Sequence, residues 1–204
     1  MSSPITYPVF RTPDSALALS VARRLVAIGD RQHAEVSVDV ELRTVPEVLR
    51  IREALPDAWF RKEDVDDWVR DPSDPTGLHG GVHAPDLPSD PEFLSPQLPL
   101  WASMEYRPVG SIEDGFAALV GSNIGEIWWS GLIWPDVPEL DLHGEPNNAR
   151  VFLLFNSRHI GVGERTDDHT VLVTVRRRGS SHDERHASWL ADQIGQSVIG
   201  PGQQ

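Results

Sequence analysis

Hydrophobic and polar residues alternate strictly over residues 34–42, which is the clearest local pattern in the chain. One parity is apolar (Val36, Val38, Val40 and Leu42), and the other is polar (Glu35, Ser37, Asp39 and Glu41). Successive side chains of a β-strand point to opposite faces of a sheet. The pattern therefore predicts a half-buried strand with its apolar side chains in the core and an acidic outer face.

Helical periodicity lies on both sides of this strand. Four apolar residues recur at helical spacing after the favourable helix start Thr12-Pro13-Asp14, namely Leu17, Val21, Leu25 and Ile28. A capping box at Thr44 and Glu47 predicts a second helix, which is expected to stop at Pro56. Three further helices are expected over residues 62–70, 111–120 and 181–194.

The second half of the chain contains the apolar runs that are typical of buried strands. Strands are expected over residues 101–109, 124–134, 151–155 and 169–178. Gly131 interrupts the second of these strands, which predicts a bulge or a tight turn at that point. Residues 156–168 are rich in turn-forming residues and are expected to join the last two strands. The last nine residues are expected to fray.

Residues 71–100 contain seven prolines and three glycines, which leave no room for a regular helix or for a strand inside a sheet. The segment also carries bulky apolar residues, among them Leu78, Leu87 and Leu94. A flexible linker would be poorer in such residues. We therefore expect a long irregular segment that packs onto the body of the protein, with a linker as the alternative.

Helices interrupt strands too irregularly for a doubly wound parallel sheet. The order of elements predicts an α+β fold with a mainly antiparallel sheet, four to five helices and the proline-rich segment packed on it. A chain of 204 residues is expected to form a single domain over residues 1–204. An alternative subdivision separates a helix–strand–helix part (1–70), the proline-rich loop (71–100) and a sheet-rich part (101–195).

The net charge of −13 is concentrated in the middle of the chain. Residues 71–149 contain thirteen acidic residues, and Arg107 is the single basic residue among them. This balance argues against direct nucleic-acid binding, because phosphate neutralisation requires a surplus of Lys and Arg. The acidic excess favours either simple solubility or an electronegative surface that steers a basic partner.

Several classes of site and location are excluded or disfavoured by composition. The absence of cysteine excludes disulfides, thiolate metal sites and cysteine nucleophiles. The N-terminal residues lack the features of a signal peptide, and no apolar run reaches the ~20 residues of a membrane span. We therefore expect a cytoplasmic protein with no membrane association. No phosphate-binding loop, dinucleotide-binding pattern or nucleophile elbow is present, and no cofactor is expected.

Tryptophans beside an acidic segment form the candidate binding site. Trp128 and Trp129 are adjacent, so on a strand they would face opposite sides of the sheet. Tryptophan is favoured at interface hot spots, and an aromatic pair beside carboxylates suits a basic protein or a cationic ligand. The candidate partner-binding residues are Trp128, Trp129, Trp134, Asp136, Glu139, Asp141 and Glu145.

A second candidate site lies in the proline-rich segment. His79, His83 and Asp86 fall within eight residues, next to two glycines. Imidazole and carboxylate groups are ligands of zinc and iron, and glycines allow a loop to fold around a metal. Such a combination also arises by chance in a chain with eight histidines. We therefore expect no bound metal and keep the metal site as an alternative.

These patterns favour a non-enzymatic, acidic, partner-binding protein over an enzyme. Both an inhibitor or immunity-type protein and a subunit of a larger assembly, such as a phage or secretion particle, fit an acidic surface that captures a basic protein. The alternative is a small metal-dependent hydrolase that uses His79, His83 and Asp86.

Overall fold

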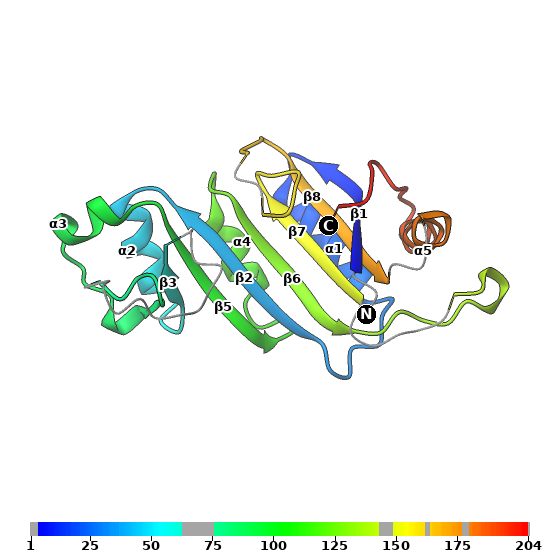
Figure 1. Cartoon of the computed structure of the whole chain (residues 1–204), viewed down its shortest axis with the longest axis horizontal. Coiled ribbons are helices and arrows are strands. Elements are labelled where there is room, and N and C mark those ends of the chain that lie inside the picture. Colours follow the sequence, from blue (N-terminus) through cyan, green and yellow to red (C-terminus); the bar gives the residue numbers. More distant parts are fainter. Residues whose placement is uncertain (1–3, 63–75, 143–148, 162–163, 177–179, 204) are drawn as a thin grey trace. The chain divides into compact units, whose positions relative to one another are not determined.

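The computed structural model describes residues 4–62, 76–142, 149–161, 164–176 and 180–203 (Figure 1). The strands are β1 (Pro4–Thr12), β2 (Glu35–Leu42), β3 (Trp59–Arg61), β4 (Val82–His83), β5 (Leu100–Pro108), β6 (Gly125–Leu132), β7 (Ala149–Phe155) and β8 (His169–Arg176). The α-helices are α1 (Ser15–Val26), α2 (Val45–Ala54), α3 (Pro91–Leu94), α4 (Glu113–Val120) and α5 (Ser180–Gln193). Within the described ranges, no helix is long and apolar enough to cross a membrane.

The eight strands form one sheet in the order β1-β8-β7-β6-β2-β5-β3-β4. The pairs β1–β8, β7–β8, β6–β7, β3–β5 and β3–β4 are antiparallel. The predicted α+β class with a mainly antiparallel sheet is therefore confirmed. The chain divides into two compact units, Met1–Ser37 with Tyr106–Gln204, and Val38–Glu105, and the boundaries fall inside β2 and β5.

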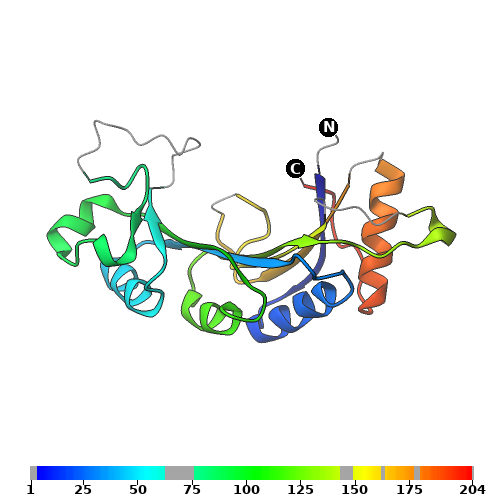
Figure 2. The ribbon, with the colours of Figure 1, turned by 90° about the horizontal axis from the view of Figure 1, so that it is seen from below.

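In the first unit, α1 and α4 lie on one face of the strands β1, β8, β7 and β6 (Figure 2). The core between helices and sheet includes the edge-to-face pair Phe116–Phe155, whose ring centroids are 6.1 Å apart. Val21 and Leu25 of α1 are buried as predicted, but Leu17 is 47% exposed. The buried face of α1 is rotated towards Ala18 and Ala22, since small side chains let a helix approach the sheet closely.

Strand β2 has its predicted alternation but not its predicted acidic outer face. The apolar parity is fully buried, and the polar residues Asp39 and Glu41 are buried as well, at 6% and 5% exposure. An Arg61 terminal nitrogen donates to Asp39 Oδ2 (2.8 Å), and Arg43 donates to Glu41 (2.9 Å). β2 is an interior strand of the sheet, so other side chains can cover both of its faces. Alternation alone identifies the two faces without telling which of them reaches solvent.

The second unit begins its helical part with the predicted capping box. The Thr44 hydroxyl accepts the Glu47 N–H, and the Glu47 carboxylate accepts the Thr44 N–H. The expected helix over residues 62–70 lies outside the described residues except for Lys62. The described part of the proline-rich segment contains β4, α3 and two short 3-10 turns. Its leucines Leu78, Leu87 and Leu94 are at most 1% exposed, so these side chains pack into the unit.

Strand β1 is an element that the sequence pattern does not predict. Pro4 and Pro8 interrupt it, and proline lacks the N–H that a strand needs inside a sheet. β1 lies at the edge of the sheet, where such a loss is tolerated, and its register shifts between Pro8 and Phe10. Edge position and bulge together accommodate a sequence that looks unlike a strand.

The C-terminal tail pairs with the outer edge of β1, so the expectation that it frays is wrong. The Ile199 N–H donates to Pro8 O at 2.9 Å. Thr6 and Gln203 exchange two backbone hydrogen bonds, of 3.0 and 2.7 Å. The tail thereby satisfies backbone groups that an open edge strand would leave without partners.

Gly131 produces the predicted irregularity in β6. The pairing of β6 with β7 shifts between Trp129 and Leu132, and Gly131 has φ +70°. A Cβ atom on Gly131 would lie 2.1 Å from the carbonyl oxygen of His33. Only glycine fits this close approach of two backbones, and the register of β6 against β7 shifts around it.

Candidate functional site

The three candidate tryptophans occupy different environments. Trp129 is fully buried beneath α4, and its indole N–H donates to Glu113 Oε1 at 3.1 Å. Trp134 is 3% exposed, and its indole N–H donates to the carbonyl oxygen of Thr174 at 2.9 Å. Both side chains serve the core, so the expectation that all three line a binding surface does not hold for them. Adjacency in the sequence cannot tell which of two neighbouring tryptophans a helix will cover.

Trp128 points to the opposite face of the sheet from Trp129. This face of β6, β7, β8 and β1, turned away from α1 and α4, is here called the open face (Figure 2). Trp128 is half-buried there and packs on a small cluster formed by Phe152, Leu154 and Leu172, with Ile160 against it. Of the three tryptophans, Trp128 alone combines an accessible ring surface with a position outside the main core.

The segment after β6 forms a turn that we call the acidic hairpin (residues 135–142). Val137 and Leu142 pair as an antiparallel bridge, with N–H···O distances of 2.8 and 3.2 Å. Between them Asp141 adopts φ +55°, a left-handed conformation that aspartate tolerates. Asp136, Glu139 and Asp141 are all exposed, and Glu145 lies outside the described residues. The hairpin stands out from the first unit as the yellow-green turn after β6 (Figure 1).

The buried carboxylate of Glu113 contacts Trp129 of β6, and the sequence pattern does not predict this contact. Glu113, at the start of α4, accepts the N–H of Gly110 (2.7 Å), the N–H of Ile112 (3.1 Å) and the indole N–H of Trp129. The Ser111 hydroxyl, just before α4, donates to Pro108 O. A carboxylate near a helix N-terminus is stabilised by the helix dipole. Here the same carboxylate also holds the indole of Trp129 through its hydrogen bond.

A segment between β7 and β8 folds over the open face (Figure 2). Asn156 begins this segment at φ +53°, and its side-chain amide donates to the carbonyl oxygens of Gly121 (3.0 Å) and Asn123 (2.6 Å). Its backbone N–H donates to Nδ1 of the buried His169 at 3.2 Å. Burial lowers the pKa of His169 below its ordinary value, against the opposing effects of the Pro13 backbone and of Asp168 and Asp14. The imidazole is therefore neutral at neutral pH and acts as an acceptor.

The alternative metal site is not assembled. Within the described part of the chain, no group of three or more His, Cys, Asp or Glu residues is placed to hold a metal ion. His83 pairs in β4 opposite Trp59, and their ring centroids are 5.4 Å apart. Asp86 is exposed in a 3-10 turn after β4. Closeness in sequence therefore does not bring His79, His83 and Asp86 together around one point.

Comparisons with protein-family models, with curated proteins and with solved structures find nothing that matches this chain.

Proposed function

We propose that this protein binds a basic protein partner through the acidic hairpin, with Trp128 on the open face as an aromatic contact. The exposure of Asp136, Glu139 and Asp141 on one projecting turn carries this proposal. The chain has no Lys or Arg between residues 108 and 149. A concentrated, projecting negative charge accelerates encounter with a positively charged surface.

The bridge between Val137 and Leu142 supports a preformed contact element. A turn that is already closed loses little conformational freedom when it binds, which favours affinity. Trp128 lies on the strand that leads into the hairpin, and a half-buried tryptophan can bury further area at small entropic cost. An inhibitor or immunity-type protein and a subunit of a larger assembly would both use such a surface.

The experiment that tests this proposal is site-specific photo-crosslinking in cells that express the protein. A photoreactive amino acid replaces Glu139 in one variant and the exposed Glu35 in a control variant. We expect a discrete crosslinked product at position 139 whose partner has a basic surface, and no such product at position 35. A partner that is itself acidic, or equal crosslinking at both positions, would overturn the proposal in favour of charge that serves solubility alone.

A further inference from the structure

The bulge in β1 determines which side chain reaches one end of the open face. Before the bulge, Thr6 pairs with Thr174 and their hydroxyls hydrogen-bond at 2.9 Å on this face. After it, Arg11 pairs with Thr170, which has the same parity as Thr174. Without the extra residue, Phe10 would take this place, because one residue of shift exchanges the two faces of a strand. Bulges re-aim side chains in this way, often at functional sites.

Arg11 is half-buried, and its guanidinium makes one hydrogen bond to the described residues. Its Nε–H donates to Thr170 Oγ1 at 3.4 Å, which is a long contact. The Thr170 hydroxyl in turn donates to the carbonyl oxygen of Ser157 at 3.0 Å. No other acceptor for Arg11 is found among the described residues. The four terminal N–H groups of this guanidinium thus have no acceptor among the described residues.

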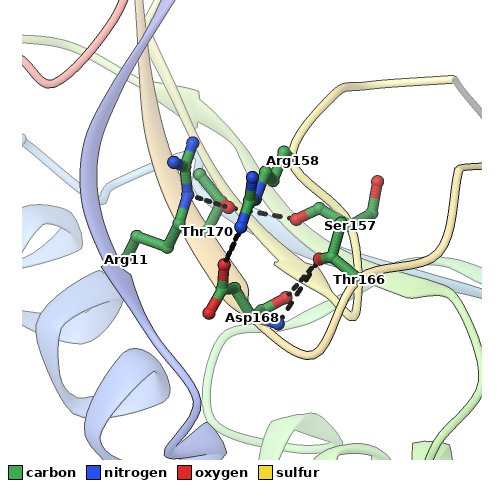
Figure 3. A network of polar contacts seen from close by, with 6 residues as sticks. All are labelled: Arg11, Ser157, Arg158, Thr166, Asp168 and Thr170. Carbon is green, nitrogen blue, oxygen red and sulfur yellow. Dashed lines mark hydrogen bonds and ion pairs between the residues drawn. The ribbon is translucent and has the colours of Figure 1, made fainter.

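A second arginine lies in the same network of polar contacts (Figure 3). Arg158 belongs to the segment that folds over the open face, and its Nε and a terminal nitrogen bind Asp168 Oδ2 at 3.2 and 2.5 Å. Figure 3 shows the Thr170 hydroxyl between the Arg11 and Arg158 side chains, with Asp168 below them. Arg158 is thus paired with Asp168, whereas Arg11 has no carboxylate partner among the described residues.

The positions of these groups are fixed by their neighbours. The Thr166 hydroxyl accepts the Asp168 N–H and also contacts the Asp168 carbonyl oxygen, both at 3.3 Å, which orients the loop that carries Asp168. Gln203 of the C-terminal tail donates to the carbonyl oxygen of Arg158 at 3.2 Å and accepts the N–H of Ile160 at 3.2 Å. The backbone around Arg158 and Asp168 is thus held in place, which lowers the entropic cost of capturing a ligand.

We propose that Arg11 and Arg158 form a binding site for a small oxyanion, a carboxylate or a phosphate group. Guanidinium groups match both anions, because their planar N–H forks bind two oxygens at once. The free donors of Arg11 supply the main contact, and Arg158 adds charge while it stays bonded to Asp168. This site is separate from the acidic hairpin and does not depend on the role proposed for the hairpin.

The first test is a titration of the wild-type protein with inorganic phosphate and, separately, with acetate, at constant ionic strength. The side-chain Nε–H signals of Arg11, Arg158 and Arg165 are followed by NMR. Arg165 is exposed in the same segment and serves as the internal control. We expect saturable shifts of Arg11 and Arg158 with little change at Arg165, and the stronger of the two anions identifies the preferred chemistry. Equal, non-saturating shifts of all three signals would overturn the proposal.

The second test compares three variants whose fold is checked by circular dichroism. Arg11→Gln removes charge-assisted hydrogen bonds and should weaken anion binding about tenfold or more, whereas Arg165→Gln should leave it unchanged. Asp168→Asn removes the competing carboxylate and should strengthen binding severalfold. If the cluster had a purely structural role, Asp168→Asn would instead weaken anion binding. Weaker binding in that variant, or unchanged binding in Arg11→Gln, would contradict the site; if Arg11→Gln does not fold, the wild-type titration and Asp168→Asn decide.

Discussion

The buried carboxylate of Asp39 should make the stability of the protein depend on pH in a defined direction. Burial raises the pKa of Asp39 from 3.8 to about 6, although Arg61 and the Val40 N–H lower it, and Glu105 adds a small increase. Between these two values the folded protein keeps a proton that the unfolded chain has released. The stability that Asp39 contributes is therefore present at low pH and lost as the pH rises through the folded-state pKa.

The size of this effect follows from the two pKa values. One unit of pKa shift corresponds to about 1.4 kcal/mol between the two protonation states. Integrated from about pH 5 to about pH 8, the contribution of Asp39 to the free energy of unfolding should fall by about 1 kcal/mol. Asp39 is 6% exposed, so solvent screening reduces this value little.

The measurement is urea unfolding of the wild type and of Asp39→Asn at several pH values in this range. Asparagine does not titrate but retains an oxygen for Arg61. The difference between the two unfolding free energies therefore isolates Asp39, while the titration of His169 cancels. We expect the wild type to lose about 1 kcal/mol relative to the variant as the pH rises. Asp114→Asn is the control, because Arg23 lowers the pKa of the exposed Asp114 and its difference should be flat in this range. A flat or rising difference for Asp39→Asn would refute the reasoning.

Three further predictions concern the backbone and the C-terminal tail. Tyr106 is 67% exposed at φ +55°, so Tyr106→Gly should raise the free energy of unfolding by about 1 kcal/mol; a loss of stability would contradict strain at this residue. Gly131→Ala should lower the free energy of unfolding by about 2 kcal/mol or more, because the new Cβ meets His33 O. An unchanged urea midpoint would show that the two backbones separate easily. Removal of residues 199–204 should increase amide exchange at Thr6, whose N–H donates to Gln203 O, and unchanged exchange would contradict the pairing.

The sequence was informative where local pattern decides structure and uninformative where distant residues decide it. The alternation in β2 predicts its two faces correctly, but the burial of Asp39 depends on Arg61, which lies 22 residues away. Adjacency predicts opposite faces for Trp128 and Trp129, yet the partner that marks Trp129 as the buried one is Glu113 of α4. Strand β1 escapes prediction because its prolines are accommodated by an edge position and a bulge, which are properties of the whole sheet.

The candidate site shows the same division. Acidic composition alone indicates that the segment with Asp136, Glu139 and Asp141 is exposed, because carboxylates without partners are rarely buried. Its hairpin form is known only from the structure. The cationic pair of Arg11 and Arg158 has no local signature. It arises from a bulge in β1 and from a segment between β7 and β8, and residues so far apart in sequence meet only in the folded sheet.

The most direct measurement is the rate of association with the crosslinked partner, at about 0.15 M and about 1 M salt. Asp136→Lys with Glu139→Lys is compared with Glu35→Lys and Glu53→Lys, a control pair of exposed acids that changes the net charge equally. We expect the hairpin pair to slow association about tenfold at the lower salt concentration and little at the higher one, because steering acts within a Debye length. The control pair should have a much smaller effect. An association rate that the two pairs change equally, or that the hairpin pair leaves unchanged, would contradict the role of the acidic hairpin in binding.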